Sequence, residues 1–344
     1  MQPCKLRPSA PAPGRYHAGM QRLICRNGRE RMLAALDHRP TDRPPHFESM
    51  FELEHEAFGL RFPDRRSWAG MDAATKDRAI SGCLEIYARV IEEFRWDALC
   101  VYWPWGDPDG VRAAKRAFGD SILVGGMVGG AVWAIETIHD WEGFSVRLAE
   151  DIDGLHAEAD AMCNRAIDLI DRLAEAGADF AYLPHDVADN RGPFMAKRHF
   201  DALVWPRYQR LVERCHQRGL RAFLHSDGQV TSLVERYAAI GADLLQSLDP
   251  MAGVDIARIR PMVRGRLALM GNVPCNLLQD TDAGAIAKAV RYCLDACDDG
   301  AGGHVFSTSN TIFPGMPLAS YRAMLDAFNA WCAERTTTAK AAHA

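Results

Sequence analysis

The second half of the chain alternates helical patterns with short apolar runs, and this alternation constrains the fold most. One helical pattern ends at Gly177-Ala178-Asp179, directly before the apolar run 180–183. The same Gly-Ala-Asp sequence recurs at 241–243, directly before Leu244-Leu245. Glycine commonly follows the last residue of a helix, and a short apolar run bounded in this way is typical of a buried strand. The repeat predicts the same helix-to-strand turn at two places.

Eight short segments qualify as strands. They cover or begin near residues 45–50, 98–103, 122–126, 180, 222, 244, 267 and 304. Helical patterns separate them, which is the arrangement that parallel strands with crossover helices require. The 344 residues allow two domains but also fit one barrel. We predict an α/β protein with a single (β/α)8 TIM barrel over 21–334, a disordered extension over 1–20 and a disordered tail over 335–344.

Composition and motifs exclude several classes of protein. Lys plus Arg is 40 and Asp plus Glu is 45, a net charge of -5, which is far from the basic balance of a nucleic-acid binder. No apolar run reaches the roughly 20 residues that span a bilayer. The glycine-rich stretch 125–130 lacks the spacing and the lysine of a phosphate-binding loop and indicates a flexible loop at the barrel mouth.

The cysteines suggest a cellular compartment. The ten cysteines are scattered without a CxxC motif, a pattern that suits a reducing cytosol. The proline-containing residues 1–20 lack the apolar core of a signal peptide. We therefore expect a cytoplasmic protein with a small-molecule substrate and no nucleic-acid or membrane partner, and we keep a homodimer open.

In a parallel barrel the active site lies at the carboxyl ends of the strands, and the sharpest cluster there is His225-Ser226-Asp227-Gly228. In extended backbone, residues i and i+2 point to the same side, so His225 and Asp227 can face one pocket. Imidazole and carboxylate are good ligands for Zn²⁺. Glu48, Asp249 and Ser309 are possible third ligands, among which the sequence does not choose; the metal hypothesis below uses Glu48. The competing interpretation is a hydrogen-bonded His–Asp pair that shapes the loop.

Other polar and aromatic residues at strand ends are further candidates. His185 and Asp186 suit proton transfer, as does His225, because an ordinary imidazole titrates near neutrality. The alternative for the first two is a loop pair that caps the next helix. Aromatic and amide side chains at strand ends could bind substrate, although such aromatic residues often close a core. These are Trp103, Trp105, Asn272 and Asn310.

Several segments together resemble the uroporphyrinogen decarboxylase superfamily, and within it the branch of cobalamin-linked methyltransferases. The segments that carry the resemblance are 29–36, 42–45, 177–186, 225–228, 271–273 and 307–310. The match covers roughly residues 25–332. It implies a (β/α)8 barrel with its site at the carboxyl ends of the strands, as the strand pattern also predicts.

The chain departs from both branches of this superfamily in its functional residues. An arginine-rich segment that grips the carboxylates of the porphyrinogen should follow the first strand, but residues 46–52 contain no arginine. A substrate with eight carboxylates needs a basic pocket, so porphyrin chemistry is not expected. The methyltransferase branch binds zinc through a His-x-Cys pair and a later cysteine. Here the pair is His225-x-Asp227 and the later position is Ser309, which makes the site richer in oxygen ligands.

Three hypotheses follow. The first is a metal-assisted methyltransferase in which Zn²⁺, held by His225, Asp227 and Glu48, polarises the oxygen of a methoxylated or methylated small molecule. The methyl group passes to the corrinoid of a separate partner protein. The second is a metal-free decarboxylase or lyase in which His185 or Asp186 protonates a carbanion. The third is a non-catalytic barrel that binds a ligand or a partner protein.

Overall fold

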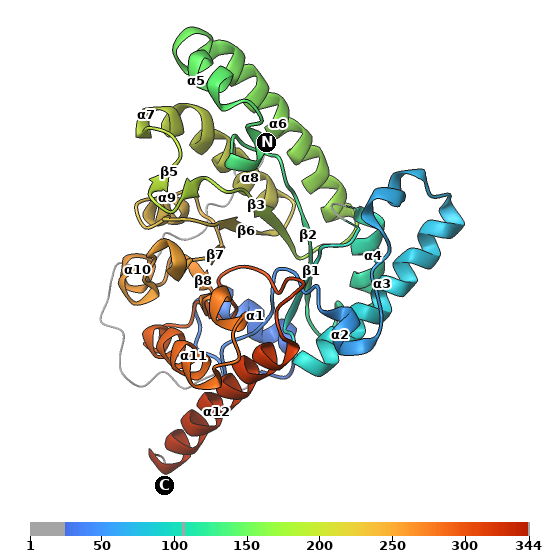
Figure 1. The fold of residues 1–344 in the computed structure, drawn as a ribbon, viewed down its shortest axis with the longest axis vertical. Coiled ribbons are helices and arrows are strands. Elements are labelled where there is room, and N and C mark those ends of the chain that lie inside the picture. The colour runs from blue at the N-terminus through green and yellow to red at the C-terminus, as the bar shows by residue number, and fades with distance from the viewer. Residues whose placement is uncertain (1–24, 105–106, 343–344) are drawn as a thin grey trace, which may run out of the picture.

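Seven parallel strands form one curled sheet in the computed structural model, which describes residues 25–104 and 107–342 (Figure 1). Neighbours in the sheet follow the order of the chain, and each neighbouring pair is parallel. The strands are β1 (Ala98–Val101), β2 (Leu123–Met127), β3 (Phe180–Pro184), β6 (Arg221–Ser226), β7 (Leu244–Ser247), β8 (Ala268–Met270) and β9 (His304–Val305). The predicted α/β architecture is confirmed. The predicted extension over 1–20 and Trp105 lie outside the described residues.

The predicted first strand, residues 45–50, is not a strand in the structure. It makes only an isolated parallel bridge there, between His46 and Phe306. The Pro45 carbonyl accepts a hydrogen bond from Phe306 N (2.8 Å), and the His46 carbonyl accepts one from Asp97 N (2.7 Å). The segment therefore lies between β9 and β1. Because Pro44 and Pro45 have no N–H to donate, a full ladder cannot form here. The described residues form a seven-stranded sheet with this segment at its opening, instead of the expected closed barrel of eight strands.

Helices surround the sheet and connect successive strands (Figure 1). The helices are α1 (Gly28–Leu36), α2 (Glu54–Phe58), α3 (Ala73–Phe94), α4 (Pro108–Phe118), α5 (Trp141–Glu150), α6 (Ile152–Glu175), α7 (Lys197–His199), α8 (Trp205–Gln217), α9 (Val234–Ala239), α10 (Ile256–Val263), α11 (Ala283–Cys297) and α12 (Leu318–Ala342). Helices α5 and α6 project beyond the sheet. Helix α12 continues past Trp331, where the sequence pattern placed its end. Two short strands, β4 (Ala188–Asp189) and β5 (Gly192–Pro193), form a hairpin after β3.

Aromatic rings fill the interior of the sheet, and two glycines in β2 allow close packing against the strand. Phe180 and Phe223 stack with their ring centroids 4.3 Å apart. A Cβ at Gly125 would lie 2.4 Å from the Phe180 ring, and one at Gly126 would lie 2.8 Å from Leu173. Both glycines are buried in β2. They therefore belong to the core, and the prediction of a flexible loop there was wrong for these two residues.

The repeated Gly-Ala-Asp turn is confirmed at both places. Gly177 and Gly241 have φ values of +87° and +84°, the left-handed conformation that follows a helix end. The Asp179 N–H donates to the Val124 carbonyl (2.7 Å), and the Asp179 carboxylate accepts from Val124 N (3.0 Å). Asp243 makes the same pair of hydrogen bonds to Ala222 in β6, donating to its carbonyl (3.0 Å) and accepting from its N–H (2.9 Å). Each turn thus joins the start of one strand to its neighbour.

Two expectations concern the molecule as a whole. No helix in the described part of the chain combines the length and the hydropathy that crossing a bilayer requires. No disulfide joins the nine cysteines of that part, and eight of the nine are buried.

Candidate metal centre

Asp186, His225 and Asp227 converge at the carboxyl ends of β3 and β6. One potential ligand atom from each residue lies within 4.8 Å of the other two. His225 Nε2 lies 3.5 Å from Asp186 Oδ1 and 3.7 Å from Asp227 Oδ1. One imidazole nitrogen and two carboxylate oxygens at such separations form a donor set suited to Zn²⁺, with a fourth position open to a ligand.

The register of β3 and β6 produces this convergence. Pro184 pairs with His225, and the His185 N–H donates to the His225 carbonyl (3.1 Å). One residue further, the Asp227 N–H donates to Asp186 Oδ1 (2.9 Å). Gly228 has a φ of +85°, and a Cβ there would lie 2.3 Å from the Ala188 carbonyl oxygen. The loop after β6 can therefore press against the β4–β5 hairpin only with glycine at this position.

Gln246 orients the imidazole of His225. Gln246 Oε1 accepts a hydrogen bond from His225 Nδ1 and another from the Tyr182 hydroxyl (2.8 Å). Gln246 Nε2 donates to the Asn310 carbonyl (3.2 Å), so the direction of the amide is determined. With the proton on Nδ1, the neutral imidazole presents the Nε2 lone pair to Asp186 and Asp227. This is the tautomer that a metal ligand requires.

The Asp227 carboxylate is held by two further side chains. The Ser247 hydroxyl donates to Asp227 Oδ1 (2.7 Å), and Asn310 Nδ2 donates to Asp227 Oδ2. Asn310, predicted to bind substrate, therefore contacts the candidate metal ligand. Sequence reasoning assigned no role to Ser247, Gln246 or Tyr182. Gln246 is a polar residue at a buried strand end, which was a usable signal, whereas Tyr182 cannot be told from ordinary core.

The surroundings of the three side chains are strongly acidic. Burial lowers the pKa of His225, but the carboxylates of Asp227 and Asp186 outweigh it and raise that pKa to about 9. Burial alone would raise the pKa of Asp186, yet the hydrogen bond and charge of His225 hold it below its ordinary value. Burial raises the pKa of Glu136, and the nearby Asp186 carboxylate raises it further. Burial likewise raises the pKa of Asp249, and the Asp227 carboxylate adds to that rise. The negative charge of the site favours a bound cation. When no metal is bound, protonation of His225 supplies the positive charge.

Glu48 lies apart from this group. Its buried carboxylate accepts hydrogen bonds from Ser307 Oγ (2.6 Å), Thr308 Oγ1 (2.8 Å) and Thr308 N (3.1 Å). Burial raises its pKa to about 7. In the structure, Asp186 is the residue that lies beside His225 and Asp227. The sequence interpretation used Glu48 as this third potential metal ligand.

The remaining candidates take other places. His185 is buried, its Nε2 accepts from Ala131 N (3.0 Å), and burial lowers its pKa to about 3. Such an imidazole is neutral at pH 7 and is a poor general acid. Asn272 donates to the Leu248 carbonyl (2.8 Å). Trp103 is buried and its ring meets Trp68 edge-on at 5.1 Å. These contacts support the surrounding loops.

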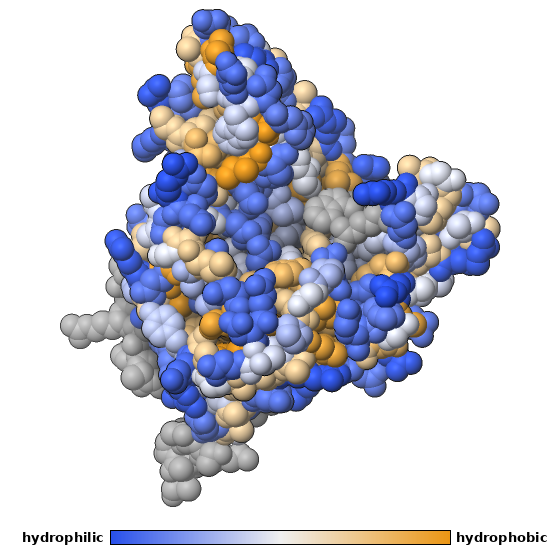
Figure 2. Space-filling view, viewed as in Figure 1, coloured by the Kyte–Doolittle hydropathy of each residue, from blue (hydrophilic) through white to orange (hydrophobic). Residues whose placement is uncertain are grey.

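An open depression of about 690 Å³ gives access to the site. Asp186, Asp227 and Asp249 line it. Arg191 is the one cation among the described residues of its lining, and it pairs with Asp189 (2.9 Å). The space-filling view is hollowed between the projecting α5–α6 pair and the α3–α4 pair, and this hollow is largely hydrophilic (Figure 2). The entrance therefore offers little to a polyanion.

The fold and the site together define a parallel α/β protein with a polar centre at the carboxyl ends of its strands. The family model described as uroporphyrinogen decarboxylase (URO-D) matches residues 109–331, which is more than half of the chain. The chain belongs to the uroporphyrinogen decarboxylase family.

Individual relatives are more distant. The chain is 28% identical to a uroporphyrinogen decarboxylase of Anaeromyxobacter dehalogenans over 231 residues, which are 65% of this chain and 63% of the relative. A second uroporphyrinogen decarboxylase, from another Anaeromyxobacter strain, is 26% identical over 230 residues. The match spans less than two thirds of the length of these relatives. A methyltransferase from Methanosarcina mazei has a similar fold, with a TM-score of 0.69, 16% identity and coverage of 89% of this chain and 99% of that one.

Proposed function

We propose that the protein is a zinc-assisted methyltransferase. It moves a methyl group from a methoxylated or methylated small molecule to the corrinoid of a separate partner protein, in the cytoplasm. The convergence of Asp186, His225 and Asp227 is the observation that carries this proposal. The similarity in fold to a methyltransferase and the earlier resemblance to the cobalamin-linked branch support it.

The chemistry of the donor set fits zinc. The Nδ1–H of His225 is used by Gln246, so Nε2 is free to bind a metal beside the carboxylates of Asp186 and Asp227. Bound Zn²⁺ would polarise the oxygen that carries the methyl group and so stabilise the alkoxide or phenoxide that leaves. Ligands rich in oxygen suit an oxygen leaving group better than the thiol chemistry of the cysteine-containing relatives.

The residues of the chain would perform the other tasks. Gln246 holds the imidazole, while Ser247 and Asn310 hold Asp227, so the three ligands are preorganised before substrate enters. Glu136 and Asp249 add negative charge around the centre. This charge disfavours a substrate with many carboxylates, such as a porphyrinogen, and favours a neutral methoxylated compound.

A second candidate is a metal-free decarboxylase for a small carboxylated ring compound, because both curated relatives are uroporphyrinogen decarboxylases. The C–C bond to the carboxylate would break, CO₂ would leave, and the carbanion would take a proton. His185 is unsuited to give that proton, and Asp186 is held ionised. The protonated imidazole of His225 would be the donor, since its pKa is raised to about 9.

Metal analysis combined with a methyl-transfer assay tests the proposal. We expect the purified protein to bind one zinc ion, and His225→Ala and Asp186→Asn to bind it much more weakly. With a methoxylated aromatic compound and a Co(I) corrinoid protein, methyl transfer should follow zinc content and stop with a chelator. Failure of the wild type to bind zinc would refute the mechanism. Release of CO₂ that ignores chelators would instead support the decarboxylase.

A further inference from the structure

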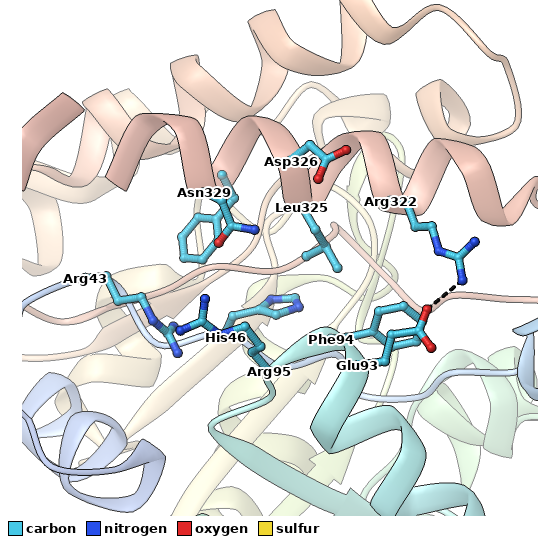
Figure 3. A pocket seen from close by; sticks show the side chains of 10 residues that line it. Arg43, His46, Glu93, Phe94, Arg95, Arg322, Leu325, Asp326 and Asn329 are labelled. Atoms are coloured by element: carbon cyan, nitrogen blue, oxygen red, sulfur yellow. Dashed lines mark hydrogen bonds and ion pairs between the residues drawn. The ribbon is translucent and has the colours of Figure 1, made fainter. Parts of the chain in front are cut away.

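A second pocket lies at the opposite end of the sheet from the candidate metal centre. It encloses about 190 Å³ between the end of α3, the start of the 45–51 segment and one face of α12 (Figure 3). Its lining includes Phe94 and Arg95, which precede β1, whereas the metal centre lies at the carboxyl ends of β3 and β6. The two sites are therefore separated by the length of the strands.

The pocket has an apolar floor and a cationic end. Phe94, Leu325 and Phe328 form the floor, and all three are less than 10% exposed. Arg43 and Arg95 lie at one end, next to Asn329, and the Glu93–Arg322 ion pair (2.6 Å) lies at the other (Figure 3). Asp326 also lines the pocket, but Figure 3 shows its carboxylate turned away from Arg95. Charged and polar side chains thus lie at the two ends of the pocket, and apolar side chains form the floor between them.

Arg95 is the cation that is available to a ligand. Arg43 forms an ion pair with Asp97, with contacts of 2.7 and 3.0 Å, and Arg322 forms one with Glu93. No carboxylate in the described part of the chain forms an ion pair with Arg95. Its backbone is left-handed (φ 54°, ψ 46°) at the end of α3, a conformation in which glycine is usual. The guanidinium of Arg95 in the pocket lining, unpaired among the described residues, is the observation that points to a bound anion.

We propose that this pocket binds a small organic monocarboxylate, with its carboxylate on Arg95 and its apolar body on Phe94 and Leu325. An arginine guanidinium offers paired N–H donors to a carboxylate, and Asn329 adds an amide donor at the same end. Benzene fills an apolar cavity of roughly 150 Å³, so a pocket of about 190 Å³ has room for a ring of that size and a carboxylate. The neutral imidazole of His46 closes the inner wall, with both ring nitrogens hydrogen-bonded.

Calorimetric titration of the full chain with benzoate, and with benzamide as its uncharged isostere, tests the proposal. We expect benzoate to bind at least ten-fold more tightly than benzamide. Arg95→Ala should weaken benzoate binding at least ten-fold, and Asn329→Trp, on the exposed rim, should block it. Arg198→Ala, which removes an exposed arginine outside the pocket, is the matched control and should change nothing.

Asp227→Asn separates this site from the candidate metal centre. We expect it to leave benzoate binding unchanged even if it abolishes zinc binding, so failure of either proposal is distinguishable from failure of the other. Thermal denaturation verifies that each variant is folded. The proposal is overturned if benzoate does not bind, if it binds no better than benzamide, or if Arg95→Ala and Asn329→Trp both bind it like the wild type. Loss of binding in Asp227→Asn alone would also overturn it, because the ligand would then sit at the metal centre.

Discussion

The two ring nitrogens of His225 face different kinds of group. Nδ1 donates to a neutral amide oxygen, while Nε2 faces two carboxylates. Two half-buried carboxylates this close to each other favour a positive charge between them. A proton on Nε2 supplies it in the free protein, and a metal ion would displace that proton. Zinc binding should therefore be coupled to proton release.

Gln246 supports this arrangement, so its replacement should weaken metal binding. In Gln246→Leu, a side chain of similar size removes the acceptor for His225 Nδ1, and the imidazole loses its fixed orientation and tautomer. We expect zinc affinity, measured by calorimetric titration, to fall by roughly 10- to 100-fold, as is usual when the hydrogen-bond partner of a metal-bound histidine is lost.

Tyr182→Phe is the matched control for this prediction. It removes the second donor to Gln246 Oε1 but leaves the contact between Gln246 and His225. We expect a much smaller loss of zinc affinity than in Gln246→Leu. Equal zinc affinities for Gln246→Leu and the wild type would show that Gln246 does not orient the ligand.

Part of the candidate site could be predicted from single residues. His225 and Asp227 share a side because they are two positions apart in extended backbone, and this holds without knowledge of the fold. The place of Asp186 depends on the pairing of Pro184 with His225 across two strands, which no local pattern encodes. Glu48 met the same local criteria as Asp186, but it follows a segment that turns it toward Ser307 and Thr308.

At the scale of elements, the Gly-Ala-Asp turn works as a connector between neighbouring strands. Besides its bonds to Val124, the Asp179 carboxylate contacts Arg29 (2.7 Å) and Lys115 (2.6 Å). Asp243 likewise contacts His216 (2.7 Å) and Arg221 (2.9 Å). The turn was predictable because glycine and aspartate have distinct local roles. The basic partners come from distant elements and were not predictable.

Removal of one of these carboxylates should destabilise the fold. Asp179→Ala leaves the Val124 N–H without its side-chain acceptor and two part-buried cations, Arg29 and Lys115, without their carboxylate partner. We expect the free energy of unfolding, measured by urea denaturation at pH 7, to fall by about 3 kcal/mol. Asp120→Ala, at an exposed position nearby, should change it by less than about 0.5 kcal/mol. Similar values for the two variants would contradict this role for the turn.

At the scale of the whole molecule, the sheet is completed by a segment that is not a strand. The alternation of apolar runs and helices predicted the seven real strands, because each is a continuous buried run between helices. Residues 45–50 contain only two large apolar side chains, Phe47 and Met50, and follow Pro44; their backbone pairing is limited to one isolated bridge. Side chains join this segment to the residues after β9, and the buried carboxyl of Glu48 is one such link, through Ser307 and Thr308.

Glu48 should make stability depend on pH in a specific direction. Burial raises its pKa from 4.5 to about 7 in the folded protein, so the folded state binds this proton more tightly than the unfolded state. The contribution of Glu48 to the free energy of unfolding therefore falls as the pH rises from about 4.5 to 7 and is constant above that range. An uncharged isostere, Glu48→Gln, lacks this dependence.

We expect the unfolding free energy of Glu48→Gln, relative to the wild type, to rise by roughly 2–3 kcal/mol between pH 5 and pH 8, because a shift of one pKa unit corresponds to about 1.4 kcal/mol. Urea denaturation of both proteins at the two pH values measures this change, and Glu56→Gln, at an exposed position on α2, corrects for general effects of charge. The comparison across pH cancels the difference in hydrogen bonding between glutamine and the protonated carboxyl. A constant difference between Glu48→Gln and the wild type would mean that Glu48 titrates normally, and hence that the opening between β9 and β1 admits enough water to solvate a carboxylate.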